Sequence, residues 1–266
     1  DTFTGMSCAA PVLAGMAALV NDFFIDKTGR PLTHAAMCRF FLDHAQDIEA
    51  EGKDVLTGWG IPRLPDPGEI DVKKYQPEEE KTMKILLIAG HGAGDPGAVA
   101  TVDGVKYKEA DETRKLVALL AAELGKYEVD VQTYDTARNA FADYKAGTLA
   151  LPAADYVLEV HFNAIAADPG DGKTKGAECY VTTTEKGTAV EEAICKAIAA
   201  LGFRNRGVKR TNFAVISRAK AAGASAALLE TCFLDDTDDM RLYKKSPEKV
   251  AQAVTGAIAA GFGLKK

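Results

Sequence analysis

The 266-residue chain has few cysteines, and none of the five forms a Cys-x-x-Cys pair or the spacing of a zinc knuckle. A cysteine-built structural zinc site is therefore not expected. Their odd number and wide spacing indicate reduced, mostly buried thiols, as in a protein made in a cytosol. These cysteines are Cys8, Cys38, Cys179, Cys195 and Cys232.

The chain also lacks an excess of basic residues, because 32 Lys and Arg against 38 Asp and Glu give a net charge of −6. Binding to a phosphate backbone needs a basic surface, so no nucleic acid partner is expected. No segment offers the roughly 18 uninterrupted apolar residues of a membrane span, so no integral membrane segment is expected. The sequence has no charged region followed by an apolar stretch and a cleavage site, so no signal peptide is expected. We therefore expect synthesis in the cytoplasm, and a chain that starts at Asp1 indicates a trimmed or partial protein.

What the chain does contain is ordinary for globular protein, with 47% hydrophobic and 26% charged residues. The prolines of the 62–77 stretch, a Pro67-Gly68 turn and the charged Glu78-Glu79-Glu80 run indicate a connection between two folding units. We assign residues 1–75 to the first unit, 76–83 to the linker and 84–266 to the second unit. No internal repeat or low-complexity tract is found.

The second unit alternates short apolar runs with segments of helical spacing, which predicts a single α/β domain. Its expected architecture is one open sheet, parallel or mixed, flanked by helices. The predicted strands are 83–89, 128–134, 156–161, 177–182, 213–216 and 226–230, and the predicted helices are 112–125, 186–201, 238–244 and 247–261.

Two histidines are the only ones in this unit, and each lies at the end of a predicted strand: His91 follows Ile85–Ala89 and His161 follows Tyr156–Val160. Carboxyl ends of strands in an open α/β sheet meet at the edge where such folds place their sites. One such histidine is as often a hydrogen-bonded structural residue, but two together favour a metal site. Glu230 ends another apolar strand, where a carboxylate is either catalytic or part of a buried ion pair.

Four segments in order resemble the amidase_3 family of zinc-dependent N-acetylmuramoyl-L-alanine amidases, with the phage endolysin branch as the most similar. They are Ile88–Ala98 around His91, Tyr107–Asp111 around Glu109, Val160–Ala164 around His161, and Leu228–Asp236 around Glu230. Two departures are visible, since Ala93 replaces a usual glycine and Ala110 a usual lysine. Neither change removes a ligand.

The resemblance implies zinc ligands at His91, Glu109 and His161, and a catalytic glutamate at Glu230. Two imidazoles and one carboxylate leave a fourth position for water, which is the ligand count of a catalytic zinc. The implied reaction is hydrolysis of the amide between N-acetylmuramic acid and L-alanine, with peptidoglycan as partner and the bacterial cell wall as site of action. On the residues alone, the third ligand stays open between Glu109 and its acidic neighbours, which are Asp103, Asp111 and Glu112.

Three further residues are candidates for substrate binding. Asn163, two residues after His161, could hydrogen-bond substrate or support the site, or could be a turn residue. Arg206 and Lys209 lie in a segment that the resemblance places beside the substrate groove. Their charges would meet peptide-stem carboxylates, although a solvated basic turn fits equally well.

The first unit resembles the C-terminal part of subtilisin-like serine peptidases, on the segment Thr4–Gly15 with Ser7 at the nucleophile position. In that family the serine opens a buried helix, and Ala9–Val20 is apolar on nearly every face. The family's aspartate and histidine precede the serine, and only six residues precede Ser7 here. His34 and His44 come after it and are poor substitutes, so Ser7 is expected to be a helix N-cap.

Two other functions compete with the amidase. One is a subtilisin-like serine peptidase that would be active only with upstream sequence that supplies its missing aspartate and histidine. The other is a catalytically inactive wall-binding module that keeps the groove. Metal removal distinguishes the amidase from the peptidase, and the presence of all four motif residues argues against the inactive module.

Overall fold

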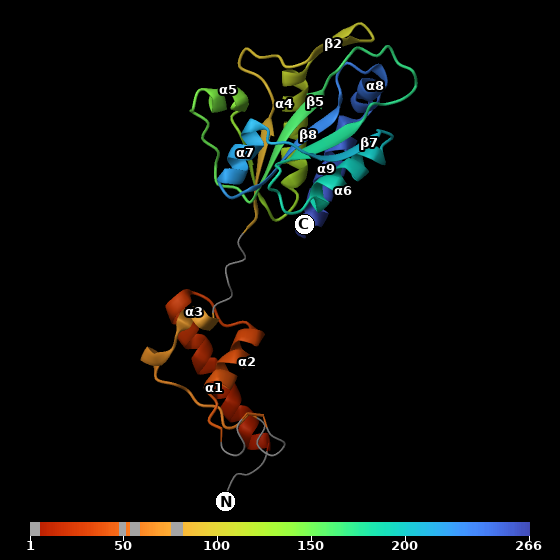
Figure 1. The fold of residues 1–266 in the computed structure, drawn as a ribbon. Helices are drawn as coiled ribbons and strands as arrows, with labels where there is room; N and C mark the ends of the chain where they lie inside the picture. The colour runs from red at the N-terminus through yellow and green to blue at the C-terminus, as the bar shows by residue number, and fades with distance from the viewer. Residues whose placement is uncertain (1–5, 48–51, 54–58, 76–81) are drawn as a thin grey trace, which may run out of the picture. The chain divides into compact units, whose positions relative to one another are not determined.

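The computed structural model describes residues 6–47, 52–53, 59–75 and 82–266, without the side chains of residues 6–8. The chain divides into two compact units, residues 1–81 and residues 82–266, and each is described by itself (Figure 1). The predicted linker 76–83 falls mostly on residues 76–81, which lie outside the described part of the chain.

The regular elements described in the first unit are α1 (Met6–Thr28), α2 (His34–Asp43), the 3₁₀ turn η1 (Pro67–Glu69) and α3 (Val72–Tyr75). An isolated bridge also pairs Gln46 with Ile61. A small core holds these pieces together, formed by Val20, Phe24, Leu32, Phe40 and Tyr75. Tyr75 packs edge-on against Phe24 and donates from its hydroxyl to Asp43. The end of the proline-rich stretch therefore belongs to the first unit, because Tyr75 completes this core.

Helix α1 forms, but its apolar surface is not buried as the sequence predicted. Residues 9–19 are exposed or half-buried, with Val12 63% and Leu19 61% exposed, and the first buried position is Val20. The window Ala9–Thr28 is long and apolar enough to cross a membrane, which the sequence analysis did not anticipate. A core helix and a signal sequence pass the same test, so this is weak evidence for a span.

The second unit is built on a six-stranded sheet in the order β4-β1-β5-β8-β6-β7. Its strands are β1 (Lys84–Ala89), β4 (Asp130–Thr133), β5 (Tyr156–Asn163), β6 (Ala177–Val181), β7 (Asn205–Arg210) and β8 (Ser225–Phe233). All neighbours pair in parallel except β6 and β8, which are antiparallel. The predicted α/β fold with a mixed open sheet is confirmed.

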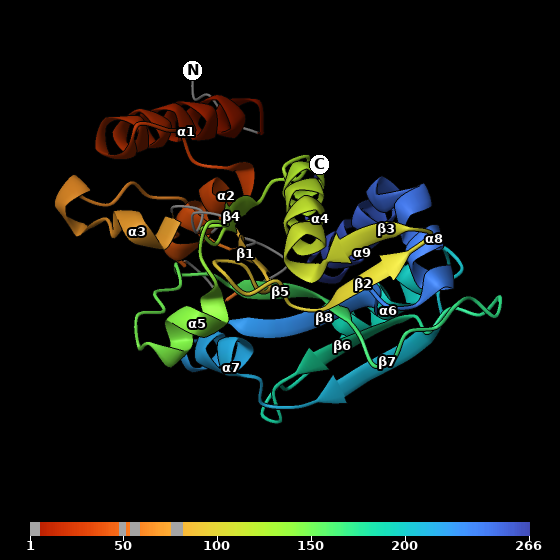
Figure 2. The same cartoon turned by 90° about the horizontal axis from the view of Figure 1, so that it is seen from above.

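Helices cover the sheet on both faces, which gives three layers (Figure 2). The larger core packs α4 (Glu109–Leu124), α6 (Ala189–Ala199) and α9 (Pro247–Phe262) against one face. The smaller core packs α7 (Ala214–Ala221) and the start of α5 (Ala140–Lys145) against the other. Helix α8 (Thr237–Lys245) follows β8, and the hairpin of β2 (Val99–Val102) and β3 (Val105–Lys108) precedes α4.

One prediction of local structure is wrong. Residues 213–216 were predicted as a strand, but Phe213 is the N-cap of α7 and residues 214–216 are its first turn. Val215, Ile216 and Ala219 share the buried side of that helix, at the spacing of a helical face. The basic segment at 205–210, which the sequence left open between a substrate-side segment and a solvated turn, is edge strand β7.

Candidate metal centre

The predicted site residues gather at the carboxyl ends of the central parallel strands. Gly90 separates His91 from the end of β1, Glu109 is the first residue of α4, and His161 lies near the end of β5. The parallel register pairs His161 directly with Glu230 on β8. The side chains of His161 and Glu230 point to the same sheet face as α7. Val157 and Leu228, four and two residues earlier on the same strands, belong to the core on that face.

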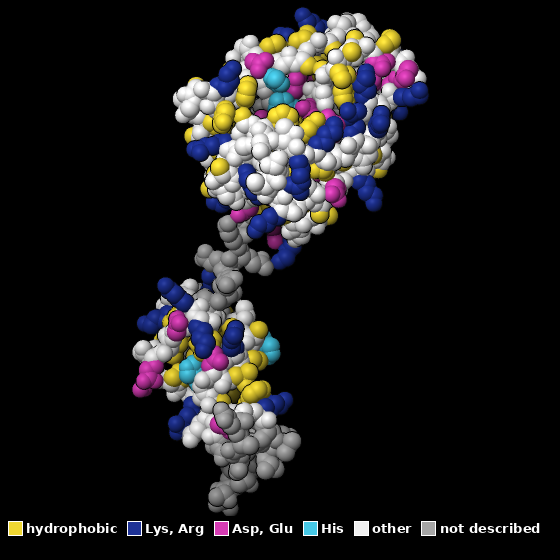
Figure 3. All heavy atoms as spheres, viewed as in Figure 1, with side chains coloured by type: hydrophobic (Ala, Val, Ile, Leu, Met, Phe, Trp, Pro, Cys, Tyr) yellow, Lys and Arg dark blue, Asp and Glu magenta, His cyan; other side chains and the backbone are white. Residues whose placement is uncertain are grey.

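His91, Glu109 and His161 form a cluster whose potential ligand atoms all lie within 4.8 Å of one another. Glu109 lies between the two rings, with Oε2 at 3.1 Å from His91 Nε2 and Oε1 at 2.9 Å from His161 Nδ1. It is the one group of this kind found among the described residues. Figure 3 shows histidine side chains together with acidic ones on this surface of the second unit.

The loop that carries His91 has a backbone that few residues adopt. His91 has φ 60° and Ala93 has φ 46°, in the left-handed region where the backbone of residues other than glycine is strained. Glycine is needed at two close approaches, because a Cβ at Gly90 would overlap the His161 ring and one at Gly97 would lie 2.6 Å from Glu109 Oε2.

Arg114 on α4 holds this loop in place. Its guanidinium donates to five backbone carbonyls, which belong to Gly90, His91, Ala110, Thr136 and Arg138. A planar fork with five donors suits this task, and the bond to the His91 carbonyl is 2.9 Å long. Arg114 therefore stabilises the strained residue that carries one of the two imidazoles.

Each imidazole has a second carboxylate on the ring nitrogen that faces away from Glu109. Asp95 Oδ2 lies 2.8 Å from His91 Nδ1, and Asn139 donates to the same oxygen. Glu159 Oε1 lies 3.3 Å from His161 Nε2. Glu109 itself accepts backbone N–H groups from Ala98 and Phe162, which fix both of its oxygens.

The electrostatics of the cluster favour a cation. Burial lowers the pKa of His161, but hydrogen bonds to Glu109 and Glu159 outweigh it and raise that pKa well above its usual value. Burial would raise the pKa of Glu109, yet the hydrogen bonds from His161 and His91 hold it well below its usual range. The pocket thus stabilises positive charge at the imidazoles, and its two nitrogen donors and one oxygen donor fit the preferences of zinc.

Glu230 lies across the strand pair from His161 and is placed differently from the other carboxylates. Burial raises its pKa to about 7. Its Oε2 is buried and has no hydrogen-bond partner among the described residues. Together with His91, Glu159 and His161 it lines a pocket of about 180 Å³, whose apolar walls include Phe141, Phe213 and Leu228.

The three candidate substrate residues converge on Glu178 of β6, which pairs with Glu230 in the sheet. Glu178 is 1% exposed and accepts from Asn163 Nδ2 at 2.9 Å, Arg206 Nε at 2.6 Å and Lys209 Nζ. The Arg206 guanidinium stacks on Phe233 at 4.9 Å. Asn163 also accepts from the backbone of Ala164, so both ends of its amide are bonded inside the protein.

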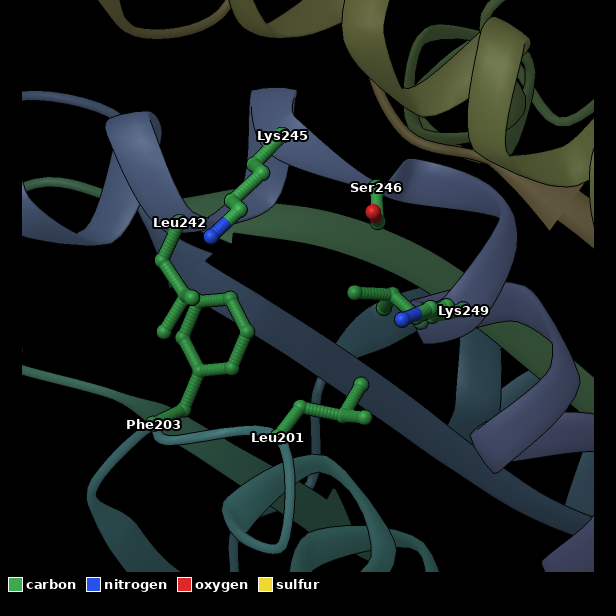
Figure 4. A pocket seen from close by; sticks show the side chains of 7 residues that line it. Leu201, Phe203, Leu242, Lys245, Ser246 and Lys249 are labelled. Carbon is green, nitrogen blue, oxygen red and sulfur yellow. The ribbon is translucent and has the colours of Figure 1, made fainter.

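A second pocket, of about 160 Å³, lies beside α8 and α9 (Figure 4). It is lined by Leu201, Phe203, Leu242, Lys245, Ser246, Lys249 and Val250. None of the predicted site residues lines it, and it contains no carboxylate or imidazole that could act in hydrolysis.

The candidate peptidase residues of the first unit do not form a described site. Ser7 lies inside the first turn of α1 rather than before it, and its side chain lies outside the described residues. His34 contacts Cys38 at 3.7 Å, and His44 contacts the Phe40 carbonyl at 2.8 Å, each one turn away on its own helix.

Sequence reasoning missed Asp95, Glu159, Glu178 and Arg114 as parts of the site. Two of them could have been noticed, because Glu159 and Glu178 are each the only carboxylate in a mostly apolar strand. Glu159 shares a face of β5 with His161, and Glu178 shares a face of β6 with Tyr180. Arg114 had no comparable signal, because its five partners are backbone carbonyls from three separate segments.

Comparison with known proteins gives a consistent result for the second unit. The N-acetylmuramoyl-L-alanine amidase family (Amidase_3) matches residues 85–260. A sporulation-specific N-acetylmuramoyl-L-alanine amidase of Bacillus subtilis is 28% identical over 195 residues, 69% of this chain and 70% of that protein.

Solved structures agree on the fold. A putative N-acetylmuramoyl-L-alanine amidase from Neisseria meningitidis has a TM-score of 0.52 and 29% identity, over 69% of this chain and 98% of that one. An N-acetylmuramoyl-L-alanine amidase from Clostridium difficile 630 has a TM-score of 0.54 and 19% identity, over 68% of this chain and 97% of that one. The family match lies within the second unit.

Proposed function

The chain belongs to the N-acetylmuramoyl-L-alanine amidase family, and from this premise we propose that it cleaves peptidoglycan with a zinc ion held by His91, Glu109 and His161. Amidase activity follows from the family membership. The bond attacked is the amide between the lactyl group of N-acetylmuramic acid and L-alanine. The observation that supports zinc is the convergence of these three side chains, from the ends of β1 and β5 and the start of α4, within 4.8 Å.

A zinc ion at this position would supply a Lewis acid that polarises the substrate carbonyl and makes a water acidic near neutral pH. The chain's own residues then handle the protons. Glu230 accepts a proton from the attacking water at Oε2, the oxygen that has no hydrogen-bond partner in the described part of the chain. It later donates that proton to the amine of L-alanine as the C–N bond breaks. A pKa of about 7 suits a group that both accepts and donates a proton.

The surface around Glu178 is proposed to bind the peptide stem. One buried carboxylate faces two cations, Arg206 and Lys209, so the cluster carries net positive charge beside Glu230. The Nε of Arg206 is used by Glu178, and its terminal nitrogens can donate to a stem carboxylate. Asn163 supports this arrangement by donating to Glu178.

We propose that the protein acts at the bacterial cell wall, in an endolysin-like lytic role. The subtilisin-like interpretation of residues 1–75 stays a prediction, because the family match starts at residue 85. No described contact of the first unit favours a serine peptidase over the amidase.

The deciding experiment incubates the protein with purified cell walls and follows the release of free L-alanine amino termini. The metal chelator 1,10-phenanthroline should abolish release, its non-chelating 1,7-isomer should not, and added zinc should restore it. Clearing of a wall suspension at the same rate would support the lytic role. Release that survives the chelator would reject zinc, and a zinc-loaded protein that binds walls without releasing amines would be the inactive wall-binding module.

A further inference from the structure

Glu159 is a buried carboxylate that the proposed reaction does not use. It is 4% exposed, on the otherwise apolar stretch Tyr156–Val160 of β5. A carboxylate in such a place is costly unless a cation or a hydrogen-bond donor compensates it. It lies two residues before His161 and therefore on the same face of the strand. Its Oε1 lies 3.3 Å from His161 Nε2.

The two nitrogens of the His161 ring thus face different carboxylates. Nδ1 lies 2.9 Å from Glu109 Oε1, on the side of the metal cluster, and Nε2 faces Glu159. A neutral imidazole carries one N–H, so a nitrogen can offer its lone pair to a metal only when the other holds the proton. A carboxylate at Nε2 favours the form in which Nε2 carries that proton.

His91 has the same arrangement with the ring nitrogens exchanged. Its Nε2 faces Glu109 at 3.1 Å, and its Nδ1 faces Asp95 at 2.8 Å. Asp95 has further donors in Gly97 and Asn139, and its side chain is 46% exposed. Glu159 is far more buried, so its charge is less screened and acts more strongly on the ring that it faces.

We propose that Glu159 is a positioning residue of the metal centre, which accepts the Nε2–H of His161 and so keeps Nδ1 free to bind the metal. This inference rests on the zinc site of the proposed function. It concerns the ring's tautomer and orientation, and Glu159 takes no part in moving protons to or from substrate.

The test compares Glu159→Gln and Glu159→Leu in the full chain by zinc competition against a chromophoric chelator. Glu159→Leu removes the acceptor and should weaken zinc binding by about 10- to 100-fold. Glu159→Gln keeps an acceptor oxygen and should weaken it less. The matched control is Glu191→Gln, another buried carboxyl, which accepts from Tyr156 and lies away from the cluster. It should bind zinc as the parent does.

A second readout separates positioning from mere charge or packing. In the zinc-loaded parent, ¹⁵N spectra of the histidine rings should show a metal-bound Nδ1 and a protonated Nε2 for His161. Glu159→Leu should lose that single state. Equal losses of affinity in the Gln and Leu variants, or unchanged ring spectra, would mean a simple charge effect and overturn the proposal.

Failure of the zinc site itself would look different. If the parent protein takes up no zinc, both the proposed function and this inference are wrong. If the parent binds zinc and Glu159→Leu binds it equally well, only the role of Glu159 is wrong. Should Glu159→Leu fail to fold, the spectra and affinity of the milder Glu159→Gln decide between the same outcomes.

Discussion

Glu230 is the residue whose two interpretations lead to opposite measurements. If Glu230 is the general base, Glu230→Gln should lower the turnover of the enzyme by at least about 10²-fold and leave its zinc content unchanged. As an anchor of a buried ion pair, the same change would cost about 3–5 kcal/mol of stability. No described residue offers a hydrogen-bond partner to Oε2, which favours the first interpretation.

The stability of Glu230→Gln gives a separate prediction for the metal-free protein. Burial raises the pKa of Glu230 from 4.5 to about 7, so the folded state binds the proton more tightly than the unfolded state. The stability that this group contributes is present below about pH 4.5 and is lost as pH rises through 7. Glu230→Gln should match the parent near pH 4 and exceed it by up to about 3 kcal/mol at pH 8. Denaturant unfolding at the two pH values measures this, and a less stable variant at pH 8 would contradict it.

Arg114 would support the proposed metal site through the backbone of the His91 loop. Arg114→Lys keeps the charge but cannot reach five carbonyls at once, so the strained loop at His91 should loosen. We expect a loss of about 2 kcal/mol of stability and weaker zinc binding. Chemical denaturation and zinc competition measure the two effects. Arg218→Lys, an exposed arginine on α7, is the control, and similar behaviour of the two variants would argue against this role for Arg114.

At the scale of elements, α5 is held near the site by a charged clamp. Asp143 accepts from Arg138 at 2.8 Å and from Tyr134 at 2.6 Å, and Asn139 links the start of this helix to Asp95 and the Gly92 carbonyl. Phe141 on the same helix forms part of the pocket wall. The clamp therefore fixes one side of the pocket.

The clamp predicts a pH dependence of stability. The Arg138 guanidinium and the Tyr134 hydroxyl lower the pKa of Asp143 from 3.8 to about 2. The stabilisation is therefore complete above about pH 4 and lost as pH falls towards 2. Asp143→Asn should melt below the parent at pH 6, and the two melting temperatures should converge near pH 2. A constant difference across this range would show that the charge of Asp143 does not matter.

The sequence predicted the elements that carry their own pattern and missed those that depend on neighbours. The strands around Ile85, Val157 and Leu228 were found because buried parallel strands are continuous apolar runs. Val215 and Ile216 misled, since two β-branched residues in a short run fit a strand as well as a helix. The hairpin of β2 and β3 was missed although Asp103-Gly104 is a strong turn signal.

The same distinction holds for the site. His91 and His161 could be predicted from strand ends, whereas Glu109 needed the family resemblance because Asp111 and Glu112 lie beside it. Only the fold shows that Glu109 lies between the two rings, since helix α4 starts at this residue. The contacts of Glu178 could not be predicted, because they join β5, β6 and β7 through side chains whose register the sequence does not reveal.

At the scale of the whole molecule, the two units should respond separately to metal. Calorimetry of the full chain should show two unfolding transitions, and only the one that belongs to residues 82–266 should rise when zinc is added. A ligand at 100 times its dissociation constant adds about 2.7 kcal/mol to the unit that binds it. A single transition, or an equal rise in both, would contradict independent units.

The parallel register that sets His161 opposite Glu230 also has a consequence in time. Strands β1, β5 and β8 contribute to one site from positions separated by most of this unit's length, and their pairing requires long crossovers to close. No half of the sheet contains a working set of residues. During refolding, helical signal should therefore return first, while hydrolysis, which needs Glu230, should appear only after β8 has joined β5.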